Sequence, residues 1–313
     1  MKKDAGMNEA ILAVDIGGSK YMTGLIRPDG TLLAKERKTW TEYTQPLIRS
    51  QLLEAVSDML GAHPDVRVIG GGVTIPGLAD PQSGVWVSTE FMGIKNYPIA
   101  RDLEKVFGLP FYIENDGRAC VLAERYFGAG RDCDDYLYIT VSNGIGGGLF
   151  LNGKLHRGAT GNAGEIGQCV VVENGRVSED GTAGTLEMYA AAAGLVQNYL
   201  EAGGCRRIDG KAPDGASIAA LAAEGDPAAL ETFRLEGYYL GKAIAALHNV
   251  LDLKKVILGG GLSLAFDLYR DTLLETVRAQ TYKRPYPSPE ILATPLGYEG
   301  ALYGAAALVF HCE

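Results

Sequence analysis

The sequence predicts an α/β protein made of two similar halves, and three observations support this. Apolar runs of strand length end repeatedly in glycine, as in "AILAVDIGG" (10–18) and "VILGGG" (256–261). Segments with helical apolar spacing alternate with these runs, which is the pattern of an α/β fold. A strand, glycine turn and strand pattern in the first 40 residues returns at 135–158, and such an internal repeat indicates duplicated architecture.

The first half reads as alternating strands and helices. Residues 10–18 are expected to form a buried strand that enters a turn, and residues 21–40 continue as strand, Pro-Asp-Gly turn and strand. Gly61 lies near the end of a helical pattern, as is common at a helix C-terminus. The further elements of this half are expected at 45–62 (helix), 66–77 (strand), 99–108 (helix) and 109–117 (strand).

The second half begins with strand, glycine-rich turn, strand, Asn-Gly turn and strand over 135–158. The elements expected after it are helices at 186–202, 226–251 and 263–280, a strand at 254–261 and a small-residue helix at 297–310. We expect one domain over 1–116 and a second over 117–297, with a C-terminal helix within 298–313 packing back on the first.

Composition narrows the class of protein. A chain of 313 residues is long enough for two cores. Its net charge of −9 argues against nucleic acid or an anionic membrane as a partner. No signal-peptide pattern and no apolar stretch of about 18 residues stands out, so we expect a cytoplasmic protein. Five cysteines without a CxxC pair fit reduced thiols.

The stretch "VSNGIGGGLFLNGK" (141–154) has five glycines among fourteen residues. Glycine weakens a strand, so something must approach this backbone closely. Backbone N–H groups that cradle a polyphosphate would explain it, and a tight hairpin is the alternative. Neither this turn nor the one at 17–18 matches the P-loop or dinucleotide fingerprints. The repetition of glycine turns after strands favours phosphate, with the turns converging on one cleft between the halves.

Acidic residues close two of the predicted strands. Asp15 could hold a hydrated Mg²⁺ against phosphates, or it could form an Asx-turn. Asp116 could take the proton from a hydroxyl that attacks a γ-phosphoryl group, while Asn115 meets sugar hydroxyls. The alternative for Asn115 and Asp116 is a turn that caps the following helix.

Six motifs, in order, carry a resemblance over nearly the whole chain: "VDIGGSK", "GVTIPG", "IENDG", "VSNGIGGG", "GNAGEIGQ" and "VILGGG". Their order resembles that in the ROK family of sugar kinases and regulators, within the actin/hexokinase/Hsp70-like superfamily. The resemblance implies two RNase-H-like domains, as in actin-like ATPases, that close on ATP, Mg²⁺ and a hexose in the cleft between them.

The resemblance also implies roles for individual residues. Asp116 would be the catalytic base, and Asp15 would hold Mg²⁺ through water. The residues implied at the nucleotide are Asp15, Gly17, Gly18, Ser19 and Lys20, then Asn143, Gly144, Gly146 and Gly147 within 143–148, and finally Gly259, Gly260 and Gly261. The residues implied at the sugar are Gly77, Asn115, Asp116, Glu165, Gln168 and Glu187. The loop at 88–98 is expected to help choose the sugar, with Asn96 either a contact or a turn residue.

The sequence departs from the family pattern at several positions. Ser19 stands where threonine is usual, and Asn143 stands where threonine or serine is usual. Gln168 replaces a frequent histidine. The stretch matching the family's zinc motif, "SEDGTAGTLE" (178–187), has Ser178, Asp180 and Thr185 in place of cysteines and keeps Glu187. We therefore expect no structural zinc, because Cys169 is the lone thiol nearby. Segment 173–185 is expected to be held by hydrogen bonds, or to be mobile.

These inferences predict ATP-dependent phosphorylation of a free hexose, with glucose-like sugars favoured. The enzymatic alternatives are an N-acetylmannosamine or N-acetylglucosamine kinase and a fructokinase. The non-enzymatic alternative is a sugar-sensing regulator without a DNA-binding domain, since only about ten residues precede the first strand. A chaperone- or actin-like assembly protein is disfavoured by "GEIG" and "IPG". The expected partners are the sugar and ATP, and a homo-oligomer is expected, with a dimer favoured.

Overall fold

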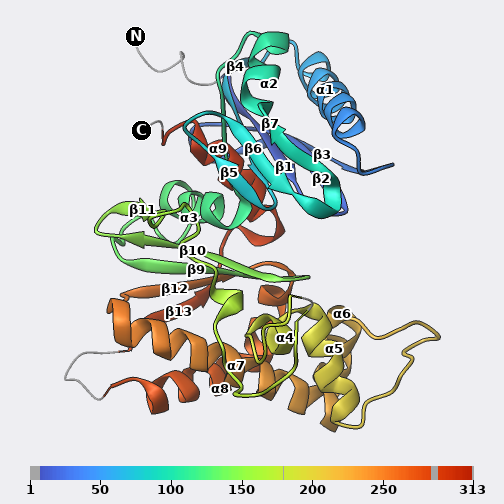
Figure 1. Cartoon of the computed structure of the whole chain (residues 1–313), viewed down its shortest axis with the longest axis vertical. Coiled ribbons are helices and arrows are strands. Elements are labelled where there is room, and N and C mark those ends of the chain that lie inside the picture. Colours follow the sequence, from blue (N-terminus) through green and yellow to red (C-terminus); the bar gives the residue numbers. More distant parts are fainter. Residues whose placement is uncertain (1–7, 179, 283–287, 312–313) are drawn as a thin grey trace. The chain divides into compact units, whose positions relative to one another are not determined.

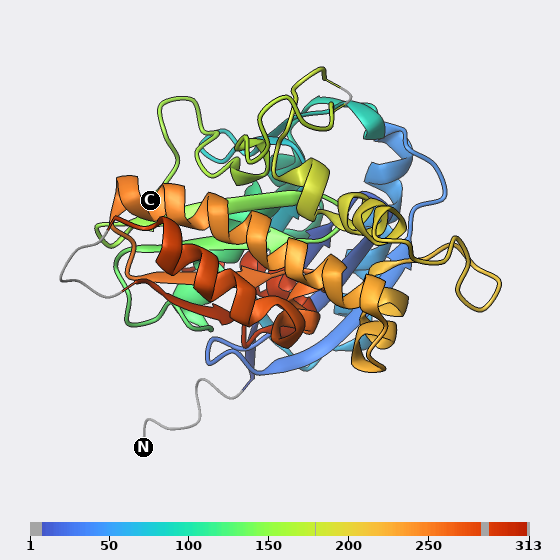
Figure 2. The ribbon, with the colours of Figure 1, turned by 90° about the horizontal axis from the view of Figure 1, so that it is seen from below.

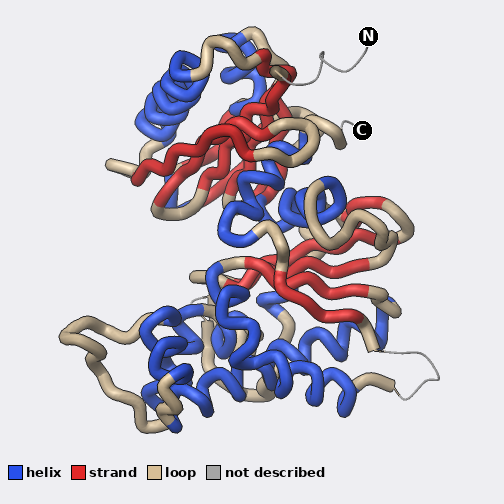
Figure 3. The backbone as a smooth tube through the Cα atoms, turned by 180° about the vertical axis from the view of Figure 1, so that it is seen from behind, coloured by secondary structure: helices blue, strands red, loops and turns tan. Residues whose placement is uncertain are grey.

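The computed structural model describes residues 8–178, 180–282 and 288–311. These residues form two compact units. The first unit runs to Asp132 and adds residues 159–161 and the chain from Glu299; the second comprises Cys133–Gly158 and Asn162–Tyr298. Each unit has its own five-stranded sheet, drawn as red strands in Figure 3. The first unit extends past the boundary expected at residue 116, because the helix that begins at Asp116 packs within it.

The sheet of the first unit has the strand order β3-β2-β1-β4-β8 (Figure 1). Strands β1, β2 and β3 are antiparallel neighbours, and β4 and β8 run parallel to β1. The bounds are β1 Glu9–Ile16, β2 Lys20–Ile26, β3 Leu32–Thr39, β4 Arg67–Ile75 and β8 Phe111–Asn115. The parallel strands therefore end at one edge of the sheet, which is where α/β folds place ligands.

Helices cover both faces of this sheet, which explains the apolar runs of β1. One face packs Leu12 and Val14 with helices α1 (Gln45–Ala62) and α2 (Ile99–Phe107). On the other face, Ile11 and Ala13 pack with helix α9 (Gly300–Leu308), and helix α3 (Asp116–Tyr126) lies against α9. The C-terminal helix thus belongs to the first unit.

A second, three-stranded sheet of the first unit comprises β5 (Leu78–Asp80), β6 (Val85–Thr89) and β7 (Ile94–Tyr97). The short helix η1 (Glu90–Met92) joins β6 to β7 and ends at Gly93, whose φ of 64° is left-handed. Residues 88–98 are therefore not simply a loop, because β7 pairs with β6 across this turn.

The second unit repeats the sheet of the first, with the order β11-β10-β9-β12-β13 (Figure 1). Again the first three strands are antiparallel, and β12 and β13 continue parallel to β9. The bounds are β9 Tyr136–Val141, β10 Ile145–Leu151, β11 Lys154–His156, β12 Lys255–Gly259 and β13 Glu290–Ala293. The internal repeat in the sequence corresponds to these two sheets.

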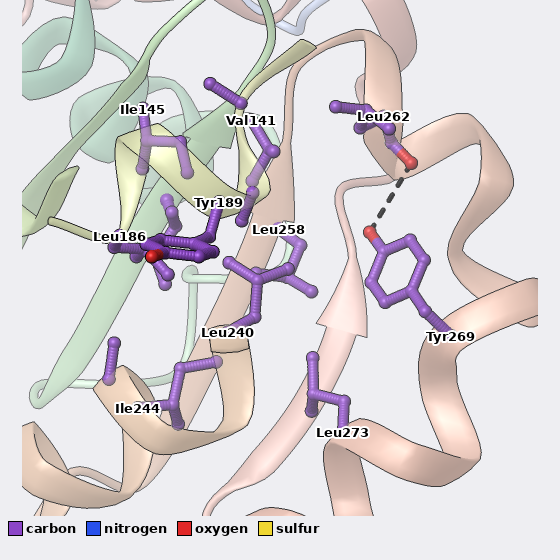
Figure 4. Close-up of a cluster of buried hydrophobic side chains, with 14 of the residues drawn as sticks. Val141, Ile145, Leu186, Tyr189, Leu240, Ile244, Leu258, Leu262, Tyr269 and Leu273 are labelled. Atoms are coloured by element: carbon purple, nitrogen blue, oxygen red, sulfur yellow. Dashed lines mark hydrogen bonds between the residues drawn. The ribbon is translucent and has the colours of Figure 1, made fainter. Parts of the chain in front are cut away.

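The long helices α7 (Pro227–Leu251) and α8 (Phe266–Gln280) lie side by side (Figure 2). Glycine permits this, because a Cβ on Gly237 would lie 2.4 Å from the carbonyl oxygen of Tyr269. Figure 4 shows the core beneath them, where the Tyr269 hydroxyl donates to the carbonyl of Leu262 at 3.4 Å. Among the described residues, no helix combines the length and apolar character needed to cross a bilayer.

Three helical expectations for the second half need correction. The helix expected at 186–202 is two helices, α4 (Glu187–Ala190) and α5 (Ala192–Glu201), which are separated by an extended Ala191. Helix α6 (Gly215–Ala223) was not predicted. The helices expected at 263–280 and 297–310 each begin with a 3₁₀ turn: η3 (Gly261–Ala265) precedes α8, and η4 (Gly297–Glu299) precedes α9.

Candidate active site

The first glycine turn joins β1 to β2. Gly17 N–H donates to the carbonyl of Lys20 at 2.9 Å, and the Trp40 indole N–H donates to the carbonyl of Gly17 at 2.9 Å. Gly18, Ser19 and Lys20 are exposed. The hydrogen bond from Trp40 therefore fixes the backbone of the turn at Gly17, and the residues at the tip of the turn are exposed to solvent.

Asp15 lies at the end of β1 with its carboxyl group held by β4. The Thr74 hydroxyl donates to Asp15 Oδ1 at 2.8 Å, because Asp15 and Thr74 are register partners on parallel strands. Burial raises the pKa of Asp15 to about 6; the Thr74 bond opposes this, the nearby Asp116 adds to it, and Arg37 lowers it. Asp15 and Asp116 are thus close enough for their charges to repel.

Asn115 and Asp116 form the junction between β8 and α3. Asn115 Oδ1 accepts from the N–H of Gly117 at 3.0 Å and of Arg118 at 3.3 Å, and Asp116 Oδ1 also accepts from Gly117 N–H at 2.9 Å. The helix-capping interpretation of Asn115 is therefore correct. Capping fixes the direction in which the Asp116 side chain leaves the helix N-terminus, where the dipole favours negative charge.

A buried ion pair that the sequence analysis missed supports this junction. Arg118 Nε donates to Glu114 Oε1 at 2.9 Å, and both side chains are at most 4% exposed. Glu114 Oε1 also accepts from Asn115 N–H at 2.9 Å. The available signal was the four-residue spacing of Glu114 and Arg118 across the predicted junction.

Gly77 lies beside Asn115, and Asn96 lies in strand β7 of the three-stranded sheet. Asn115 Nδ2 donates to the carbonyl of Gly77 at 3.2 Å. A Cβ on Gly77, whose φ is +82°, would lie 2.5 Å from the carbonyl of Ser88, so glycine is required there. Asn96 is exposed and has a left-handed φ of 49° inside β7, so it is a strand residue and not the turn residue of the alternative; its contact with the sugar stays a prediction.

The second glycine turn joins β9 to β10 in the second unit. Ser142 N–H donates to the carbonyl of Gly144 at 2.9 Å, which closes the turn around Asn143. Glu187 Oε2 accepts from Ile145 N–H at 2.8 Å, and a Cβ on Gly144 would lie 2.7 Å from the same oxygen. Asn143 and Gly144 are therefore held next to the carboxylate of Glu187.

Glu165 precedes the short helix η2 (Ile166–Gln168), Gln168 is its last residue, and the helix packs on β10. A Cβ on Gly167 would lie 2.2 Å from the carbonyl of Ile145, so the helix backbone touches the strand. Glu165 and Gln168 are both exposed. Ile145 is thus the common neighbour: its N–H meets Glu187 and its carbonyl meets the segment that carries Glu165 and Gln168.

The third glycine cluster follows β12. A Cβ on Gly259 would lie 2.0 Å from the hydroxyl of Tyr138, and one on Gly260, whose φ is +79°, would lie 2.4 Å from the carbonyl of Val141. The Ser263 hydroxyl donates to the carbonyl of Gly260 at 2.7 Å. Since Val141 ends β9, this cluster and the second glycine turn occupy neighbouring strand ends.

The segment between Gln168 and Glu187 is held by hydrogen bonds. The Ser178 hydroxyl donates to the carbonyl of Thr182 at 2.8 Å and to the Asp180 carboxylate. Thr185 forms an isolated antiparallel β-bridge with Val170. Burial raises the pKa of the Cys169 thiol, so this cysteine favours its neutral form. No cluster of three histidine, cysteine or acidic side chains occurs in the described ranges. That the chain holds no structural zinc stays a prediction.

Comparisons with known proteins identify the family. The family model described as "ROK family" matches residues 11–311. The DNA-binding transcriptional dual regulator NagC of Escherichia coli (strain K12) is 30% identical over 303 residues, which cover 95% of this chain and 74% of the regulator. The glucokinase of Thermotoga maritima is 30% identical over 314 residues, covering 96% of both chains.

The solved structures give the same result. The ROK family glucokinase from Streptomyces griseus, in complex with glucose and AMPPNP, has a TM-score of 0.83 and 28% identity, and the match covers 96% of this chain and 98% of that one. Its two-domain architecture is that of the actin-like ATPases. The family match spans nearly the whole sequence, and the two repeated sheets and six ordered motifs agree with it. The chain therefore belongs to the ROK family, and its fold is the two-domain actin-like ATPase fold.

Proposed function

We propose that the chain is an ATP-dependent kinase that transfers the γ-phosphoryl group to a hydroxyl of a free, glucose-like hexose. The observation that carries this proposal is the placement of acidic, hydroxyl and amide groups at or next to the ends of three adjacent parallel strands. Asp15 is the last residue but one of β1, Thr74 pairs with it from β4, and Asn115 ends β8 directly before Asp116, the first residue of α3. Such strand ends are where α/β folds place reacting groups.

Asp116 is proposed as the general base. It accepts the proton of the sugar hydroxyl as that oxygen bonds to the γ-phosphorus and the bond to the bridging β–γ oxygen breaks, which releases ADP. The capped junction and the buried Glu114–Arg118 pair hold the base in place. Precise placement is most of what such a reaction needs, since it has little covalent chemistry for the protein to perform.

Asp15 fits the metal-binding role expected for it. Its Oδ1 accepts from Thr74, and its carboxyl group is repelled by Asp116, so a cation nearby would lower the cost of ionising both acids. Bound Mg²⁺ would neutralise phosphate charge during transfer. The protein side of this role is to present a partly buried carboxylate whose orientation Thr74 fixes.

The three glycine-containing segments are proposed to hold the nucleotide. The exposed tip at Gly18–Lys20 and the turn at Asn143–Gly147 would meet the phosphates, and Gly259–Gly261 would lie by the adenosine. Backbone N–H groups at such turns suit anionic oxygens. For the sugar, we propose Gly77, Asn96, Asn115, Asp116, Glu165, Gln168 and Glu187.

Two kinds of alternative remain open to test. Glucokinase relatives that match over nearly their whole length favour glucose over N-acetylmannosamine, N-acetylglucosamine or fructose. The likeness to NagC favours a second function, a sugar-responsive regulator without turnover. The homodimer that the resemblance implies is likewise a proposal, which light scattering on the purified protein would check.

The deciding experiment measures ADP formation with ATP, Mg²⁺ and a panel of glucose, fructose, N-acetylglucosamine and N-acetylmannosamine. Asp116→Asn should lower kcat by about 10²–10⁴-fold while sugar binding, measured by calorimetry, stays within about threefold. Asp65→Asn, which changes an exposed carboxylate of the same unit, should behave as wild type. Sugar binding without ADP formation would favour the regulator. An Asp116→Asn enzyme that keeps more than about a tenth of wild-type kcat would refute the assignment of Asp116 as the general base.

A further inference from the structure

Arg176 binds several parts of the second unit at once. Its backbone N–H donates to the Tyr189 hydroxyl at 2.8 Å, and its guanidinium carbon lies 4.5 Å from the centre of that ring. The guanidinium also donates to Asn198 Oδ1 at 2.8 Å and to Glu201 Oε2 at 2.7 Å. Only 13% of the side chain is exposed, so these charge-assisted bonds are largely shielded from water.

The same guanidinium spans the break between α4 and α5, two helices labelled together in Figure 1. One nitrogen donates to the carbonyls of Met188 at 3.0 Å and Gly194 at 3.4 Å, on either side of Ala191. A helix that ends inside a protein leaves carbonyls without intrahelical partners. Arg176 supplies such a partner at Met188 of α4 and also reaches Gly194 in the first turn of α5, so one side chain ties the two helices together across the break.

Helix α4 is only four residues long, and Glu187 is its first residue. The Glu187 carboxylate accepts from Ile145 N–H at 2.8 Å and occupies the space where a side chain on Gly144 would lie. So short a helix has little stability of its own. The position of α4, and with it the position of Glu187 at the second glycine turn, depends on the contacts that hold the rest of this helix, at Met188 and Tyr189.

We propose that Arg176 is a positioning residue that holds Glu187 against the second glycine turn. An arginine suits this task because its planar fork offers donors in several fixed directions and stacks on Tyr189, whereas lysine offers a single point of charge. The consequence for sugar binding rests on the proposed function, in which Glu187 contacts the sugar. The positioning itself does not, since the Ile145 bond is internal to the chain.

Amide exchange of Ile145, measured by NMR, tests the positioning directly. Arg176→Met keeps an apolar stem over Tyr189 and loses every donor, so Ile145 should exchange about tenfold faster or more. Glu201→Gln is the matched control: Glu201 is 59% exposed and glutamine still accepts from Arg176, so exchange should stay within about twofold. Arg207→Met, which removes an exposed arginine bonded to Gly210, controls for the loss of charge. If Arg176→Met does not fold, Arg176→Lys replaces it with the same expectation.

Kinetics on the same variants add the functional consequence. Arg176→Met should raise the KM for the sugar about tenfold and add little to the effect of Glu187→Gln in the double variant. Unchanged Ile145 exchange in folded Arg176→Met would overturn the proposal. Faster exchange with an unchanged sugar KM would uphold the positioning and remove Glu187 from the sugar contacts; faster exchange in a chain without sugar turnover would uphold the positioning and count against the proposed kinase function.

Discussion

Replacing Asp15 by asparagine should stabilise the first unit while it abolishes activity. Burial is the main reason that the pKa of Asp15 rises from 3.8 to about 6, against the opposing bond from Thr74. The folded chain therefore holds this proton more tightly than the unfolded chain does. The stabilisation from the protonated group is complete below about pH 4 and is lost as the pH rises through about 6.

The magnitude follows from the size of the rise. At 1.36 kcal/mol per pKa unit, an increase from 3.8 to about 6 corresponds to at most about 3 kcal/mol of lost stability once the group is ionised. Asparagine removes that charge and keeps an Oδ1 that accepts from the Thr74 hydroxyl, so no partner is orphaned. Asp15→Asn should therefore raise the free energy of unfolding by about 1–3 kcal/mol near pH 8 and by almost nothing below about pH 4.

The chain offers a clean probe for this measurement. Its two tryptophans, Trp40 and Trp86, are both buried in the first unit, so their fluorescence during urea unfolding reports that unit and not the other. Asp65→Asn, an exposed change in the same unit, should shift the free energy of unfolding by less than about 0.5 kcal/mol. A stabilisation independent of pH, or a destabilised Asp15→Asn near pH 8, would refute the reasoning.

The remaining predictions concern a second acid, the rate profile and the glycines. Burial raises the pKa of Glu236 well above its usual range, and neither carboxylate oxygen has a partner, so Glu236→Gln should raise thermal stability at neutral and alkaline pH and lose that advantage below about pH 4.5. The kcat/KM for Mg²⁺-ATP, which reports the enzyme before the metal binds, should fall as pH drops through about 6, where Asp15 takes up its proton, and a profile flat to about pH 5 would contradict this. Gly164→Ala should lower the free energy of unfolding by about 2 kcal/mol or more, because the added Cβ would meet neighbouring backbone. Gly210→Ala should lower it by about 1 kcal/mol, because Gly210 also has a positive φ but nothing lies near its Cβ position. Gly146→Ala should leave unfolding unchanged and raise the KM for ATP.

Much of the fold could be predicted because local signals agree with it. Helix α1 has the predicted bounds, since Pro46 is suited to its first turn and the apolar spacing ends with it. Helix α2 ends at Gly108, whose left-handed backbone stops the helix. The repeat of strands around glycine turns indicated the two sheets before any contact was known.

The break between α4 and α5 could not be predicted, because nothing local causes it. Residues 186–202 contain no proline, and their apolar spacing is continuous. The break is imposed by distant contacts: Ala192 N–H donates to the carbonyl of Ser142, and Arg176 binds the carbonyls on both sides. Tertiary contacts of this kind override local propensity.

Some residues of the candidate site could likewise be predicted from the sequence, and others could not. Asp15, Asn115 and Asp116 could be found because each closes a predicted strand, where the fold class places reacting groups. Thr74 and the Glu114–Arg118 pair could not, because their importance comes from strand register and burial. A threonine inside an apolar run has no local feature that marks it as the partner of an aspartate on the next strand.

The glycines themselves separate into two physical classes. Some are required by the fold: a Cβ on Gly164 would lie 2.7 Å from the carbonyl of Gly147, and one on Gly144 would meet Glu187 at 2.7 Å. Gly18, Gly146 and Gly261 differ, because a Cβ would meet nothing closer than 3.4 Å and their backbones are not left-handed. One of these three lies in each glycine-containing segment proposed to hold the nucleotide. The folded chain leaves room for a side chain at these positions, and this supports the proposal that a ligand approaches the backbone there.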